Sequence, residues 1–387
     1  MSTEKVFLIR PRDPVLVRDG RPFDAEAGSY ARSLSWPMPS TLAGAVRTNV
    51  GSKLGFDWGN DGSDKALEIS VYGPILAVNK DDNAWEIYLP APKDAVIFSP
   101  KDKDTANKSI MRLSPRALPK DAGCNLPEGV FPLKAMGETE GKPDTSYVFW
   151  SLEDTVRWLI GENSIPTNSL SQLPVDARVH VKIDPQKRTS EEGKLFSTIS
   201  ICFNDVYKPV KPNTSDHNVC TAIICKVTSD KSDVTVCDGF MPFGGERRVS
   251  MIEPDGASWP EPPEKLVSKL AGQNKVKLQL VTPGIFEQGW KPGWAGGSPP
   301  GLNGLEFRLI SAAVDRRVAV SGWDYKKKWP KAARWLAPAG SVYFFETDKP
   351  LEENHIKALW LTSVSDNEQD RRDGFGIVVP GKWDYAE

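Results

Sequence analysis

The chain has 387 residues, 39% of them hydrophobic and 26% charged, which is the composition of a globular protein long enough for two domains. Its formal net charge of −2 excludes a uniformly basic nucleic-acid binder and leaves only a local basic stripe for such a role. We find neither a membrane-length apolar run nor a signal-peptide pattern, so we expect no membrane contact and a cytoplasmic location.

The first fifty residues predict a strand, a turn and a helix. Residues 6–17 are strand-like, Asp19-Gly20 forms a turn, and Ser40 stands after a proline where a helix N-cap belongs. Small and hydroxyl residues share one face of this helix with one arginine: Ser40, Gly44, Arg47, Thr48 and Gly51. Such a face allows a phosphate backbone or another protein chain to approach the helix closely. The alternative is an ordinary solvent-exposed face, which would show the same spacing of residues.

Further along, residues 91–145 show little periodicity and predict a long insertion or extended arm. A second helix is expected from Ser151, with Asp154 completing a capping pattern, to Gly161. The prolines of residues 254–265 suggest a domain boundary, and a second strand-rich unit begins at Lys275.

Residues 177–183 alternate between apolar and polar side chains, which predicts a strand with one apolar and one polar face. The polar segment 184–194 separates this strand from the next and predicts a protruding hairpin, which carries Lys187, Arg188 and Lys194. On the polar side of the first strand lie Arg178 and His180.

Two arginine groups are candidate phosphate contacts. In Gly244-Gly245-Glu246-Arg247-Arg248, consecutive glycines let backbone N–H groups approach a phosphate and the arginines supply bidentate donors. A tight hairpin with exposed arginines is the alternative. The second group surrounds the first crossover, with Phe23 and Trp36 as stacking planes: Arg18, Arg21, Arg32 and Arg47.

Two further segments have weaker signals. Residues 323–335 interleave tryptophans with basic residues, and we favour a solvated loop with a core tryptophan there. Asp373-Gly374-Phe375-Gly376 partly matches a base-stacking signature and also fits a glycine-rich terminal strand. The five cysteines lack a paired zinc-ligand spacing, so we expect no metal and no disulfide framework.

Taken in order, these segments resemble the repeat-associated RAMP proteins of CRISPR systems, and within them the family of the third Cmr subunit of type III-B effectors. The motifs are Arg18 to Phe23, Pro37-x-Pro39-Ser40-Thr41-x-x-Gly44-x-x-Arg47-Thr48, Arg178 to Val181, Glu192 to Thr198, Phe243 to Arg248, Leu280 to Pro283, Gly289-Trp290-x-Pro292, Val320 to Trp323, Pro338 to Phe344 and Gly374 to Gly376. The resemblance extends over nearly the whole chain.

The resemblance implies an α+β fold of two ferredoxin-like (RRM-like) domains with long inserted loops and hairpins, residues 1–260 and 261–387. It implies a non-catalytic subunit, without cofactor, that holds the 5′ tag of the guide RNA. It also implies that the subunit bridges the large polymerase-like signalling subunit to the backbone RAMP subunits and reaches target RNA indirectly. The RNA-binding residues would be Arg18, Arg21, Arg32, Ser40, Thr41, Gly44, Arg47, Arg178, His180, Gly244, Gly245, Arg247 and Arg248, with Lys187, Arg188 and Lys194 on the target side.

Two alternatives stay open at this point. One is a scaffold that joins its neighbours with little RNA contact. The other is an endoribonuclease of guide precursors with His180 as general base, although nothing in the sequence requires an activating and a charge-stabilising group to converge on it.

Overall fold

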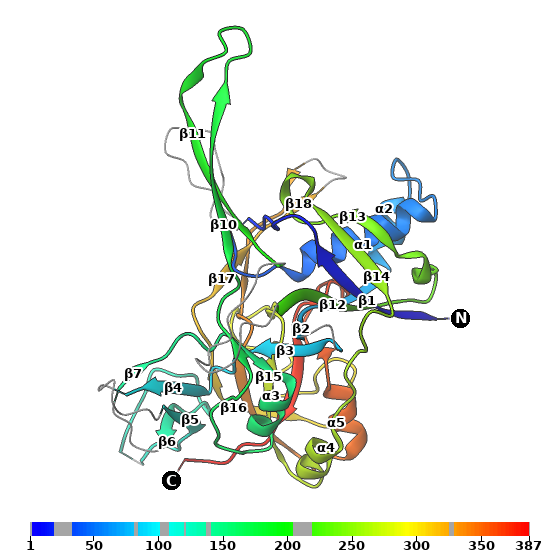
Figure 1. The fold of residues 1–387 in the computed structure, drawn as a ribbon. Coiled ribbons are helices and arrows are strands. Elements are labelled where there is room, and N and C mark those ends of the chain that lie inside the picture. The colour runs from blue at the N-terminus through cyan, green and yellow to red at the C-terminus, as the bar shows by residue number, and fades with distance from the viewer. Residues whose placement is uncertain are drawn as a thin grey trace.

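The structure is a computed structural model that describes residues 2–18, 33–80, 84–100, 108–119, 121–136, 141–203, 219–324 and 329–386. The fold is mixed α/β, rich in sheet and with few helices. Two antiparallel sheets hold most of the strands, and Figure 1 shows a long hairpin that rises from one end of the molecule.

The larger sheet has the strand order β13-β14-β1-β12-β2-β3-β8-β9. Its strands are β1 (Thr3–Pro11), β2 (Ser70–Lys80), β3 (Glu86–Pro90), β8 (Phe149–Ser151), β9 (Ser169–Leu170), β12 (Val219–Ser229), β13 (Gly239–Pro242) and β14 (Val249–Pro254). The consecutive residues Ile223 and Ile224 of β12 are both fully buried. Since neighbouring side chains in a strand point to opposite faces, both faces of the sheet are covered here.

The smaller sheet has the order β16-β21-β15-β23-β22. Its strands are β15 (Lys275–Leu280), β16 (Phe307–Ala313), β21 (Val342–Thr347), β22 (Thr362–Ser363) and β23 (Ile377–Gly381). The predicted start of a strand-rich unit at Lys275 is confirmed.

The two sheets share a pattern of strand order. In the larger sheet four consecutive neighbours are β14-β1-β12-β2, and in the smaller they are β23-β15-β21-β16. Numbered along the chain, both read fourth, first, third, second, and their pairings are antiparallel.

The helices are α1 (Pro39–Lys53), α2 (Gly62–Leu67), α3 (Leu152–Leu159), α4 (Glu264–Leu270), α5 (Glu353–Leu359) and α6 (Glu368–Arg372), with 3-10 turns η1 (Val234–Val236) and η2 (Gly245–Arg247). Ser151 caps α3 as predicted, because its hydroxyl accepts a hydrogen bond from the Asp154 N–H at 3.1 Å. The predicted cap at Ser40 is wrong. Helix α1 begins one residue earlier, at Pro39, whose missing N–H costs nothing in a first turn.

The region predicted as a long insertion or extended arm, residues 91–145, contains a small sheet in place of an extended arm. Its strands are β4 (Ala95–Ser99), β5 (Ser109–Pro115), β6 (Leu133–Met136) and β7 (Lys142–Pro143), in the order β6-β5-β4-β7. The buried Asp94 joins this insertion to the body. Its carboxylate accepts a hydrogen bond from Trp158 of α3 at 2.7 Å and pairs with Lys277 of β15 at 2.5 Å.

Two antiparallel ribbons extend from the sheets. The long hairpin is β10 (Val175–Ile183) paired with β11 (Ser190–Ile201). The shorter ribbon pairs β17 (Val318–Val320) with β20 (Arg334–Leu336), and β18 (Trp323–Asp324) with β19 (Trp329–Pro330).

One of the buried apolar clusters spans the two sheets. Leu8 and Ile75 of the larger sheet belong to the same buried cluster as Leu278 and Val379 of the smaller sheet. The predicted division of the chain near residue 260 falls between β14 and α4, and it remains a prediction.

Candidate nucleic-acid interface

The glycine-rich loop, residues 243–248, makes a tight connection between β13 and β14. Gly244 has a φ of +81°, and a Cβ at this position would lie 2.7 Å from the Leu16 carbonyl oxygen. Glycine is therefore required both by the backbone conformation and by the close approach. The prediction placed the N–H groups of Gly244 and Gly245 toward a phosphate. The Gly245 N–H instead donates to the Leu16 carbonyl at 2.7 Å.

Three residues of the loop have positive φ values. They occur at Gly244, Glu246 and Arg247, and not at Gly245. Arg247 is exposed, whereas Arg248 is partly buried and pairs with Glu246 at 2.9 Å. The loop thus presents Arg247 to solvent.

Residues 15–18 lie between this loop and the base of the long hairpin. Val15 exchanges two backbone hydrogen bonds of 2.8 Å with Ile201 of β11, while Leu16 receives the bond from Gly245. Arg18 forms an isolated bridge with Ser33 and is exposed. The glycine-rich loop, this segment and the hairpin base therefore form one continuous surface, which we call the loop–hairpin surface. Arg21 and Arg32 lie outside the described residues.

The hairpin carries two different faces along its length. Arg178 faces Thr198 across the ladder and His180 faces Phe196, so these four side chains share one face. The His180 and Phe196 rings stack with centroids 5.0 Å apart and an interplanar angle of 15°, and His180 Nε2 lies 2.9 Å from the Thr198 hydroxyl. Arg178 is exposed and pairs with Asp176 at 2.7 Å.

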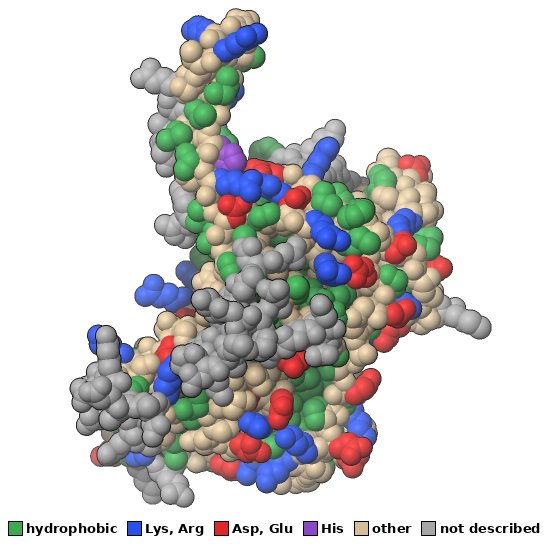
Figure 2. All heavy atoms as spheres, viewed as in Figure 1, with side chains coloured by type: hydrophobic (Ala, Val, Ile, Leu, Met, Phe, Trp, Pro, Cys, Tyr) green, Lys and Arg blue, Asp and Glu red, His purple; other side chains and the backbone are tan. Residues whose placement is uncertain are grey.

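The opposite face of the hairpin is aliphatic and exposed: Val175, Val179, Val181, Ile183 and Leu195. Figure 2 shows hydrophobic side chains along its shaft and Lys and Arg side chains at its tip. The turn is shorter than the predicted 184–194, because β11 begins at Ser190. Lys187 and Arg188 are exposed in this turn, whose backbone is held by the Asp184 carboxylate. The side chain of Lys194 lies outside the described part of the chain.

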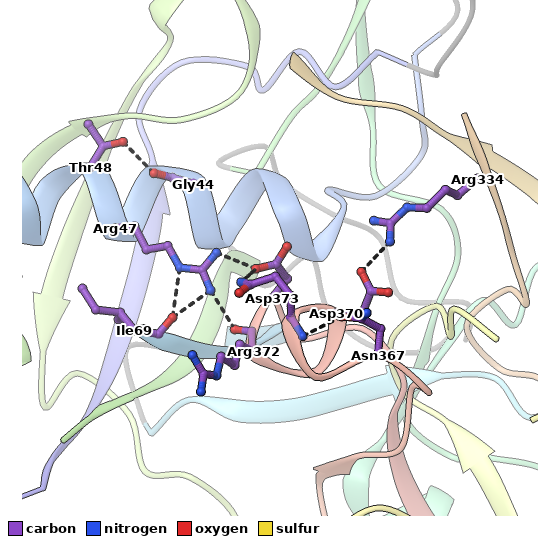
Figure 3. Close-up of polar contacts among 10 residues, drawn as sticks. Gly44, Arg47, Thr48, Ile69, Arg334, Asn367, Asp370, Arg372 and Asp373 are labelled. Atoms are coloured by element: carbon purple, nitrogen blue, oxygen red, sulfur yellow. Dashed lines mark hydrogen bonds and ion pairs between the residues drawn. The ribbon is translucent and has the colours of Figure 1, made fainter. Parts of the chain in front are cut away.

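Helix α1 differs most from its prediction, because Arg47 is buried (Figure 3). Its guanidinium donates to the Ile69 carbonyl at 2.7 and 2.9 Å and forms a 2.5 Å ion pair with Asp373. An RNA-facing role for Arg47 is therefore wrong: residues 372–374 pack over this side of the helix. Of the predicted polar face of α1, Gly44 and Thr48 are exposed, and Ser40 and the neighbouring Thr41 are half-exposed.

Two aromatic residues that were candidates for base stacking have packing roles instead. Trp36, expected as a stacking plane, packs against Phe149 and Phe203 with centroids 5.4 and 5.8 Å away. Phe375 is fully buried beside Met38 and Leu336, so it offers no surface to a base. In both cases the ring was needed for packing between segments distant in sequence.

A family model described as CRISPR-associated protein (Cas_Cmr3) matches residues 7–383. The chain belongs to this family. It is thus a Cmr3-like protein of type III-B CRISPR systems, a subunit of their effector complex, as the sequence motifs predicted.

Solved structures provide more distant similarities to this Cmr3-like chain. One is a subunit in the cryo-EM structure of the type III-B Cmr-beta complex bound to cognate target RNA and AMPPnP, with 14% identity, coverage of 88% of this chain and 86% of that chain, and a TM-score of 0.46. Another is in the crystal structure of the Csm3-Csm4 subcomplex of the type III-A interference complex, with 11% identity, coverage of 90% and 98%, and a TM-score of 0.36. A search of curated proteins finds no match.

Sequence reasoning missed two residues of the loop–hairpin surface in this Cas_Cmr3 chain. Phe196 and Thr198 lie on the same face as His180. Their alternation along β11 was visible in the sequence, but the register that places them opposite Arg178 and His180 was not. Within the described residues no helix has the length and apolar character needed to cross a membrane.

Proposed function

We propose that this Cas_Cmr3 protein is a non-catalytic, RNA-binding subunit that holds the 5′ tag of the guide RNA on the loop–hairpin surface. The proposal rests mainly on one observation. Backbone hydrogen bonds join residues 15–18 to the glycine-rich loop on one side and to the hairpin base on the other. Arg18, Arg178 and Arg247 are exposed, and each lies on one of these three converging segments.

The chemistry of this surface suits single-stranded RNA. Arginines bind phosphates through paired donors, and the half-buried stacked pair of His180 and Phe196 offers the edge of an aromatic plane to an unpaired base. A local basic surface on a chain of net charge −2 also suits a subunit that binds RNA together with partners.

The strand order supports paired ferredoxin-like units as the framework of this role. Both sheets have the fourth-first-third-second order of a βαββαβ unit, with α1 after the first strand of one and α5 after the third strand of the other. We propose that such a two-unit body bridges the large signalling subunit to the backbone RAMP subunits, and meets target RNA through its hairpin.

The tag-binding role can be tested in the complex assembled with guide RNA. Arg18→Ala, Arg178→Ala and Arg247→Ala should each weaken guide retention. Each lost phosphate contact should also make the negative slope of log affinity against log salt less steep by about 0.7. Arg308→Ala is the matched control, because Arg308 is an exposed arginine on β16 that pairs with Glu346. Retention unchanged in all three variants would favour the pure scaffold.

The target-side role of the hairpin is tested separately. Replacing residues 181–195 by a two-residue turn should leave guide retention intact and reduce engagement of target RNA next to the tag, since the removed strands project from the body (Figure 1). Normal target engagement by the shortened protein would refute this part of the proposal.

The nuclease alternative depends on His180, whose imidazole is stacked on Phe196 and hydrogen-bonded to Thr198. We propose that these contacts serve binding. Incubation of the purified protein with repeat RNA should yield no cleavage, and cleavage that disappears in His180→Ala would establish the enzyme instead.

A further inference from the structure

A cavity of about 640 Å³ lies away from the loop–hairpin surface, where the insertion meets the smaller sheet. Its walls come from residues 126–133 of the insertion, the loop at Trp290, the end of β16 and strand β20. The lining is mainly apolar, and its volume lies within the range of sites for small organic groups.

The walls are held in place by hydrogen bonds between distant segments. Phe131 N–H donates to the Ile310 carbonyl at 2.8 Å, and the Ser311 hydroxyl donates to the Phe131 carbonyl at 2.7 Å. On the other side, Tyr343 donates to the Trp290 carbonyl at 2.6 Å. The cavity is therefore formed before any ligand arrives, which lowers the entropic cost of binding.

The mouth of the cavity combines an aromatic ring with cations. Trp335 lines the cavity and remains 48% exposed, and the Arg317 guanidinium lies over its ring at 3.9 Å from the centroid. Arg317 lines the cavity and is exposed, as is the adjacent Arg316; Asp315, which also lines the cavity, is ion-paired with Lys93 at 3.0 Å. The exposed Gln288 amide, also in the lining, offers both a donor and an acceptor.

We propose that this cavity receives one unstacked base of single-stranded RNA, at a second contact separate from the proposed tag interface. An apolar slot with an indole at its mouth accepts the faces of a base, the Gln288 amide can meet its edge, and the arginines face its phosphates. An apolar protein side chain would use the slot but would have no need of a guanidinium stacked at the entrance.

The test uses the full chain and a fluorescent oligouridine without tag sequence, in which one nucleotide is 5-iodouridine. We expect crosslinks to Trp335. We also expect Trp335→Ala to weaken binding about tenfold, Arg317→Ala to weaken it, and Trp335→Phe to retain most of the affinity. Trp329→Ala is the matched control, because Trp329 is 71% exposed on the same ribbon but does not line the cavity.

The experiment separates this proposal from the tag proposal. Arg178→Ala should weaken guide retention in the complex yet leave the Trp335 crosslink unchanged, so either proposal can fail alone. Equal oligouridine affinity of the native protein and Trp335→Ala, crosslinks confined to other regions, or no binding at all would overturn the base-binding cavity.

Discussion

At the scale of single residues, charged side chains that sequence patterns assign to the surface can be structural parts of the core. Arg47 looked like a phosphate ligand on a helix of small residues, yet it links α1 to the turn after α6 through Asp373. Lys277 is fully buried in β15 and meets Asp94 of the insertion. Each of these ion pairs joins two segments far apart in the sequence.

Arg47→Ala should destabilise the protein by about 3–5 kcal/mol, because it leaves the Asp373 carboxylate without its cation and the Ile69 carbonyl without its donors. Urea unfolding measures the loss. Asp373→Ala should cost a similar amount, and the double variant should cost less than the two single changes together. Strict additivity would show that the pair does not act as a unit.

The Lys277 pair should affect the pH dependence of stability. Burial lowers the pKa of Lys277 to about 8 from 10.5, although Asp94 opposes this and Arg112 adds to it. Between these values the unfolded chain holds the proton and the folded chain has released it. The unfolded state then binds more protons, so the Lys277 contribution to the free energy of unfolding rises with pH in this window.

Chemical denaturation at several pH values can detect this contribution. The difference in unfolding free energy between the native protein and Lys277→Met should grow as the pH rises from about 8 toward 10. Groups that titrate equally in both proteins cancel in this comparison. A difference independent of pH would mean that Lys277 keeps an ordinary pKa in the folded protein.

At the scale of elements, Gly244 of the glycine-rich loop is constrained both by its positive φ and by its close contact with Leu16. Gly239 in β13 has a positive φ without a close contact, so it separates the two effects. Gly244 and Gly239 both have positive φ, +81° and +79°, but only Gly244 has a neighbour within reach of an added Cβ. Gly239→Ala should cost about 1 kcal/mol from backbone strain alone. Gly244→Ala should cost more, because its Cβ would meet the Leu16 carbonyl at 2.7 Å. Equal losses in urea unfolding would show that the loop is not tightly docked on residue 16.

At the scale of the whole molecule, the shared core should make the two sheets unfold together. Leu278 and Val379 of the smaller sheet pack in one cluster with Leu8 and Ile75 of the larger sheet, so separation would expose both sets of side chains to water. Calorimetry should therefore show one transition, and residues 261–387 expressed alone should not fold. Two resolved transitions would instead establish independent domains.

The sequence by itself determined features that depend on near neighbours. Ser151 caps α3 through the amide three residues on, the second unit begins at Lys275, and the alternation of residues 177–183 continues into a projecting hairpin. Local backbone preferences and side-chain periodicity are sufficient for such features, because caps and strand faces are set within a few residues. The ordered motifs also identified the family, which the match over residues 7–383 confirmed.

Only the tertiary structure decided which of the candidate residues reach solvent. Arg47 and its partner Asp373 are 326 residues apart, and the Gly245 amide is bonded to Leu16 near the start of the chain. The same is true of the insertion, whose short apolar runs pair into a sheet anchored by Asp94. The exposure of a side chain depends on the segment that packs over it, and no local pattern contains that information.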